Sequence, residues 1–100
     1  MASDPAVVRR EYGLSHADLR RILPRLTDAS FASAEDYFSL EFADGRRVCL
    51  TVSPERERRL GLLRLPVVDI AFSFEGTAWV ETECAAFLRH FDRAFQKGGG

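Results

Sequence analysis

Hydrophobic residues near the start of the chain recur at the spacing of one helix face, and this stripe consists of Leu19, Ile22, Leu23 and Leu26. Ser15 and Asp18 form a capping-box pattern in front of it. Pro24 lacks the N–H that a continuing helix needs, so the helix is expected to end or kink there. A shorter helix over residues 5–12 is predicted ahead of this one, because an Asp-Pro pair opens it and a glycine follows it.

From residue 36 the hydrophobic residues alternate with polar ones, which is the pattern of β-strands. One row is Phe38, Leu40 and Phe42, and a second row, after Ala43-Asp44-Gly45, is Val48, Leu50 and Val52. A three-residue turn places Leu40 opposite Val48 and Phe38 opposite Leu50, so that both rows share a face. Glu41 then meets Arg47 on the other face. A two-residue Asp-Gly turn would separate the rows, so the longer turn is predicted.

The next segment, SPERERRLGLLRLP from Ser53 to Pro66, admits two interpretations. A helix could start at Ser53, but Gly61 interrupts it and its leucines form no stripe. A strand over residues 58–64 instead places Leu60 and Leu62 on one side. A connection at residues 65–67 then sets these leucines opposite Phe72 and Ile70 of a further strand over residues 68–75. The strand is favoured because this register also keeps the apolar rows together.

After Gly76 the helical spacing returns and predicts a helix over residues 79–96. Its apolar face consists of Val80, Cys84, Phe87, Leu88, Phe91 and Phe95. The chain is therefore predicted as one α+β domain over residues 1–100, with an N-terminal helix or helices, a four-stranded antiparallel β-meander and a long C-terminal helix packed on one sheet face. The glycines at 98–100 are expected to form a flexible tail.

Composition and charge narrow the choice of function. The 14 basic and 15 acidic residues nearly balance, so no net field draws nucleic acid or anionic lipid to the protein. No apolar run approaches the roughly 20 residues that cross a bilayer. The N-terminus does not resemble a secretory signal, and two cysteines make no disulfide framework, so a cytoplasmic location is predicted. Every basic residue except Lys97 is arginine and asparagine is absent, a bias typical of GC-rich bacterial genomes.

No cluster in the sequence indicates a catalytic or metal centre. His16, His90, Cys49 and Cys84 lie apart without the spacing of metal ligands, so no metal is predicted. Cys84 and His90 share a helix but point in different directions around it. A phosphate-binding loop and a nucleophile elbow are also missing from the sequence, so no cofactor is predicted and catalysis is disfavoured. The terminal Gly-Gly resembles the end of ubiquitin-like carriers, but a helix reaching Lys97 leaves too short a tail for that role.

An arginine-rich surface is one candidate site. Its residues are Arg56, Arg58, Arg59 and Arg64, and they could bind RNA or single-stranded DNA. Glu55 and Glu57 are interleaved with them, and the exposed strand face offers only Tyr37 for stacking on bases. Charges on an edge strand also serve to prevent pairing with other chains, which is the simpler interpretation.

The predicted outer face of the sheet is the second candidate, and it favours a protein partner. It carries the small, nearly uncharged residues Ser39, Cys49, Thr51, Ala71 and Ser73. Such residues let another backbone or sheet approach closely, whereas open antiparallel sheets usually turn long polar side chains to water. Trp79 could add an aromatic anchor, although packing under the helix start is the simpler expectation. We therefore expect a homodimer or an adaptor without catalytic activity, with nucleic-acid binding as the alternative.

Overall fold

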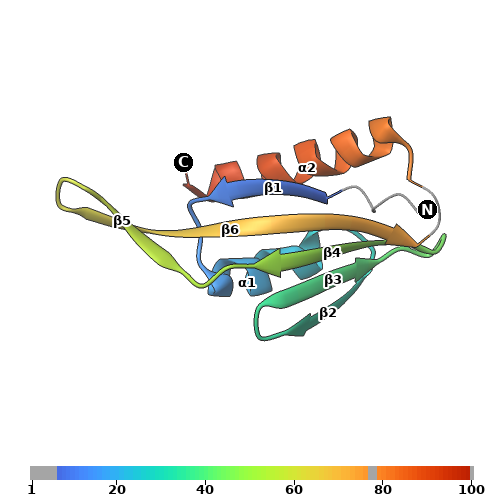
Figure 1. Ribbon diagram of the computed structural model, residues 1–100, viewed down its shortest axis with the longest axis horizontal. Coiled ribbons are helices and arrows are strands. Elements are labelled where there is room, and N and C mark those ends of the chain that lie inside the picture. The colour runs from blue at the N-terminus through green and yellow to red at the C-terminus, as the bar shows by residue number, and fades with distance from the viewer. Residues whose placement is uncertain (1–6, 77–78, 100) are drawn as a thin grey trace.

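A computed structural model describes residues 7–76 and 79–99, and of residues 96–99 only the backbone (Figure 1). The described residues form two helices and six strands. In chain order these are β1 (Val7–Tyr12), α1 (His16–Leu26), β2 (Ser30–Ala34), β3 (Tyr37–Glu41), β4 (Arg46–Val52), β5 (Arg56–Leu60), β6 (Leu63–Gly76) and α2 (Glu81–Gly99).

The long strand β6 organises the sheet. Its second half lies between β1 and β4, and the sheet runs in the order β1-β6-β4-β3-β2 with every neighbouring pair antiparallel. The first half of β6 pairs with β5 instead, so β5 continues the line of β4 after a short break at residues 53–55. Figure 1 shows the result, with β5 and the start of β6 projecting beyond the rest of the molecule.

The hydrophobic core lies on one face of the sheet, under both helices. From the sheet it takes alternate residues of three adjacent strands, and from the helices the stripes of α1 and α2. The fully buried side chains include Phe38, Leu50, Ile70, Phe72 and Phe91, together with Leu19 and Leu23. No polar or charged residue in the described part of the chain is buried. Removal of this apolar surface from water is the main force that holds the sheet against the helices.

The predicted four-stranded meander is wrong, because the described sheet has six strands. Residues 7–12, predicted as a helix, form the edge strand β1, while the Asp4-Pro5 pair lies outside the described residues. Val8 and Tyr12 are four apart, a spacing that suits one helix face and equally every second residue of a strand. Residues 30–34 form the other edge strand, β2, whose small residues give little sequence signal for a strand.

The register of the first predicted hairpin is confirmed. Leu40 pairs with Val48, Phe38 with Leu50 and Glu41 with Arg47, and Gly45 takes the positive φ that the turn requires, at 93°. The register predicted for the next hairpin is wrong. Leu60 pairs with Leu63 across a two-residue turn at Gly61 and Leu62, and Phe72 pairs with Leu50 of β4. Gly61 has a φ of 62°, as the first central residue of a type II′ turn does.

The two longer predicted helices are close to those observed, with two corrections. The capping box of Ser15 and Asp18 is present in α1, but the helix runs through Pro24 to Leu26. Pro24 removes only one backbone hydrogen bond near the end, while Leu23 and Leu26 on either side are buried and hold the last turn in place. Helix α2 starts at Glu81 and includes Gly98 and Gly99, so Val80 precedes it and is 54% exposed.

Candidate functional site

The sheet face opposite the helices, here called the open face, carries the predicted interaction residues. Strand pairing places Ser39, Cys49 and Ser73 in one row across β3, β4 and β6, and Tyr37, Thr51 and Ala71 in the next. Five residues of the predicted interaction face, namely Ser39, Cys49, Thr51, Ala71 and Ser73, thus lie side by side. The edge strands extend the rows with Ala32 and Ala34 on β2 and with Val7 and Arg9 on β1.

Trp79, the sixth predicted residue, lies elsewhere. Its ring packs edge-on against Phe74, with 4.9 Å between centroids, and against Phe42. Its indole Nε1 donates to the Glu75 carbonyl at 3.0 Å, and the guanidinium of Arg46 lies 4.6 Å from its ring centre. Trp79 is therefore held at the start of α2 on the core side of the sheet, apart from the open face.

Several polar groups on the open face are paired with one another. Hydrogen bonding to the Cys49 thiol raises the pKa of Tyr37, and Cys49 itself is only 3% exposed. Ser73 Oγ donates to Glu75 Oε2 at 3.0 Å, and Arg47 Nη2 lies 3.3 Å from Glu75 Oε1. The Glu75 carboxylate in turn raises the pKa of Arg47. These contacts leave a broad surface of small side chains, with Arg47 and Glu75 paired at one end.

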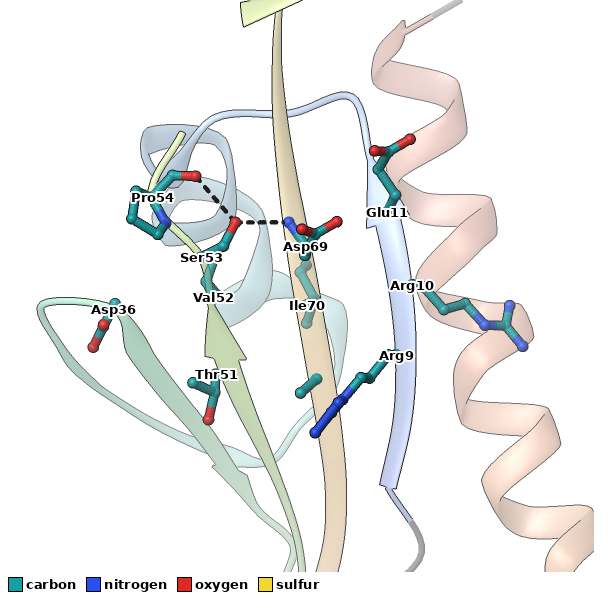
Figure 2. Close-up of a pocket in the computed structure, with 11 residues that line it drawn as sticks. Arg9, Arg10, Glu11, Asp36, Thr51, Val52, Ser53, Pro54, Asp69 and Ile70 are labelled. Carbon is teal, nitrogen blue, oxygen red and sulfur yellow. Dashed lines mark hydrogen bonds between the residues drawn. The ribbon is translucent and has the colours of Figure 1, made fainter. Parts of the chain in front are cut away.

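A hollow of about 680 Å³ lies on the open face near the other end of the strands (Figure 2). Thr51 and its pairing partner Ala71 line it from the sheet, and Arg9 and Asp36 stand on opposite sides. The Arg9 side chain extends over β6 toward Thr51 and has no hydrogen-bond or ion-pair partner among the described residues. Ser53 Oγ accepts from the Asp69 backbone N–H at 2.9 Å and donates to the Pro54 carbonyl at 3.0 Å. The hollow exists because small residues occupy the middle of the sheet between longer ones.

The most exposed apolar surface lies on the projecting ribbon of residues 56–67, here called the arm. Every residue from Pro54 to Leu65 is exposed. Among them are Leu60, Leu62, Leu63 and Leu65, with exposed fractions of 54%, 102%, 62% and 39%. An isolated two-stranded ribbon is marginally stable in water, and exposed leucines add nothing to its stability there.

The two faces of the arm differ in character, because side chains alternate along each strand. Leu60 and Leu63 are directly opposed and share a face with Leu65, which is opposite Arg58. The other face carries Arg59 directly opposite Arg64, two like charges that repel. Arg59 has a 3.8 Å contact with Glu57, and Arg64 has no ion pair within the described chain. The arm is therefore apolar on one face and cationic on the other.

The predicted polyanion-binding arginines are divided by this geometry. Arg56 and Arg58 lie on the leucine face, where Arg56 contacts Asp69 at 2.7 Å and Glu11 at 2.8 Å, and Arg58 contacts Glu11 at 2.9 Å. The hydrogen bonds to Asp69 raise the pKa of Arg56. These pairs fasten the base of the arm to β1 and β6. Only Arg59 and Arg64 remain without a strong carboxylate partner in the described residues.

Other candidate chemistry is dispersed. Cys84 and Cys49 are free, and burial raises the pKa of the Cys84 thiol. His16 Nε2 is 2.8 Å from the Ser53 carbonyl and His90 Nε2 is 2.8 Å from the Leu26 carbonyl, so both rings contact backbone. The described residues contain no group of three or more His, Cys, Asp or Glu side chains that could hold a metal ion.

Comparisons with known protein families, with characterised proteins and with solved structures gave no significant match to this chain. No helix in the described ranges is long and apolar enough to cross a membrane.

The exposed leucines of the arm are functional candidates that the sequence-based interpretation missed. The sequence pattern predicts Leu60 and Leu62 in the core, opposite Phe72 and Ile70, and places Leu65 in a connection. The signal for a separate ribbon is Gly61-Leu62, since a two-residue turn with Gly at its first position pairs Leu60 with Leu63. That register leaves the leucines without a helix to cover them.

Proposed function

We propose that this chain is a protein-interaction module, and that the leucine face of the arm meets its partner. The observation that carries the proposal is the exposure of Leu60, Leu63 and Leu65 together on one face of a ribbon that leaves the body. Contiguous exposed apolar side chains on an otherwise folded protein mark sites of association. The buried core is complete without them, so packing within the chain does not account for the leucines.

The open face supports the same proposal. It follows the leucine face of the arm along β6, beyond the ion pair of Arg56 and Asp69 at the base of the arm, and small residues there permit close approach of another surface. The leucines of the arm provide apolar anchors for the partner, and the open face provides a flat surface beside them. We further propose a cytoplasmic location in a bacterium, which the two free thiols and the arginine-rich composition favour.

Site-specific photo-crosslinking in living cells tests this proposal. A photoreactive phenylalanine analogue at Leu63 or Leu65 should give a crosslinked product containing a second polypeptide. The matched control is the same analogue at Arg64, which lies between the two leucines on the same strand and points to the opposite face. Absence of product from both leucine positions, or equal yield from position 64, would contradict the proposal.

Nucleic-acid binding is a second candidate, favoured by one observation. Arg59 and Arg64 face each other on the arm and lack a strong carboxylate partner among the residues described, so an anion would relieve their repulsion. This candidate requires binding of RNA or single-stranded DNA at about 50 mM salt that Arg64→Glu removes and that Leu63→Ser leaves intact. The protein-interaction proposal instead requires that Leu63→Ser removes binding of the protein partner and that Arg64→Glu leaves it intact.

A further inference from the structure

We infer that the partner of the arm is a second copy of this chain, and that each copy inserts the leucine face of its arm into the hollow on the other copy's open face. The inference rests on the proposed function, because it names the partner that the arm meets. Four observations carry it: the shared direction of the two surfaces, an arm that fits within the length of the open face, the shape of the hollow, and the distribution of charge.

The arm and the hollow face the same side of the molecule. Along β6 the odd-numbered residues Leu63, Leu65 and Val67 continue into Asp69 and Ala71 of the open face. Arg58, which is opposite Leu65, lies 2.9 Å from Glu11 of β1. This contact shows that the arm keeps the same orientation beyond its base. Two copies placed with their open faces together therefore also turn their arms toward each other.

The arm fits within the length of the open face. Strand β5 is 5 residues long, or roughly 17 Å at the usual rise per residue. The part of β6 in the body, residues 69–76, spans roughly 27 Å at the same rise. A two-fold axis between the faces, near Val67 and perpendicular to β6, sets Leu63 over the second copy's Ala71 and Leu65 over its Asp69, two residues that line the hollow. Each arm then lies on the other open face without reaching past its end.

The hollow suits leucine side chains. Thr51 and Ala71 offer methyl groups on its sheet side, and its volume of about 680 Å³ has room for more than one such side chain. The pairing is reciprocal, because each chain supplies one arm and one hollow. Reciprocal contacts of this kind close into a dimer and leave no arm free to recruit a third copy.

The charges permit two such faces to meet. Arg56 and Arg58 on the leucine face are neutralised by Glu11 and Asp69 of their own chain. Arg9 and Asp36 on the walls of the hollow have opposite signs. The unneutralised pair Arg59 and Arg64 points away from the interface, toward water.

Analytical ultracentrifugation of the purified full chain tests the inference. The wild type should sediment as a dimer at tens of micromolar, and Leu63→Ser with Leu65→Ser should weaken dimerisation about 100-fold or more, because four leucines leave the interface. Ala71→Arg should have a similar effect by filling the hollow, with Thr51→Arg as a second blocking variant should the first not fold. Arg64→Ser is the matched control and should dimerise as the wild type does.

Mixing the defective variants provides the decisive result. A chain with the defective arm keeps its hollow, and a chain with the blocked hollow keeps its arm. An equimolar mixture should therefore form heterodimers with one intact arm-to-hollow contact, although neither variant dimerises alone. Contact between two arms, or between two open faces alone, predicts no such recovery.

The inference is overturned by a monomeric wild type, by an Ala71→Arg variant that dimerises normally, or by a mixture of defective variants that stays monomeric. If the wild type is monomeric while Leu63 still crosslinks to a different polypeptide in cells, only the identity of the partner is wrong. If no crosslink forms either, the proposed function fails as well.

Discussion

Individual aromatic residues determine how the second helix meets the sheet. Phe91 of α2 lies within 5.0 Å of Phe72 and 5.1 Å of Tyr12 between ring centroids, in edge-on contacts, and 4.4 Å from Phe95. At the border of this cluster the Tyr12 hydroxyl donates to Asp92 Oδ1 at 2.6 Å, and burial together with that bond raises the pKa of Tyr12. The cluster therefore joins β1, β6 and α2 at one point.

Replacing Phe91 with alanine should lower the free energy of unfolding by about 3–5 kcal/mol, since the side chain is fully buried and leaves a cavity. Urea titration followed by circular dichroism would measure the loss. Val80→Ala is the control, because Val80 was predicted on the same apolar stripe but is exposed; its effect should stay within about 0.5 kcal/mol. Equal losses at the two positions would contradict the packing described.

At the scale of elements, local patterns were predictable and pairings between distant segments were not. The capping box of α1, the hairpin of β3 and β4, and the apolar face of α2 each depend on residues close in sequence. Strand β1 needed a partner more than 55 residues away, Val8 pairing with Phe72, and its own residues suit a helix equally well. Leu60 and Leu62 of the arm are predicted in the core because alternation indicates a strand without saying whether anything covers it.

The same limit applied to the candidate site. Five of its six predicted open-face residues lie together, since they follow from strand alternation and register. Trp79 packs against Phe74 before the start of α2, as the simpler of its two interpretations predicted. The hollow needed side chains from β1 and from the connection between β2 and β3, which the sequence did not place beside β4 and β6.

The start of α1 supplies a test that depends on pH. Hydrogen bonding from the Ser15 backbone N–H lowers the pKa of Asp18, so the charged carboxylate stabilises the folded state. This contribution is complete above the unfolded-state pKa, about 3.9, and is lost as the pH falls through the lower folded-state pKa. Asp18→Asn should therefore be less stable than the wild type at pH 7, and the difference should shrink below about pH 4.

Thermal unfolding of both proteins between pH 7 and pH 2.5 would measure that difference. Ser15→Ala removes the other half of the capping box and should cost about 0.5–2 kcal/mol at neutral pH. A difference between wild type and Asp18→Asn that stays constant down to the lowest pH would show that the carboxylate charge does not act in the folded state.

At the scale of the whole molecule, the body and the arm have separate roles. The body buries a continuous core between the sheet and two helices, and the exposed part of the arm contributes nothing to it. The pair Arg56 and Val67 closes the base of the arm, where Val67 is 4% exposed and Arg56 binds two carboxylates. The sheet is therefore complete at this pair, and what lies beyond it is the part that we propose contacts other molecules.

A shortened chain separates the two roles. Replacing residues 57–66 with Asn-Gly leaves Arg56 opposite Val67 across a two-residue turn, which preserves the register of β6 with β4 and β1. Because the removed side chains are almost all exposed, the free energy of unfolding at low protein concentration should stay within about 1 kcal/mol of the wild-type value. The wild-type melting temperature should rise with protein concentration, since dimerisation stabilises the folded state, and that of the shortened chain should not. Calorimetry over a hundredfold range of concentration measures both effects, and a shortened chain that fails to fold would assign the arm to the fold itself.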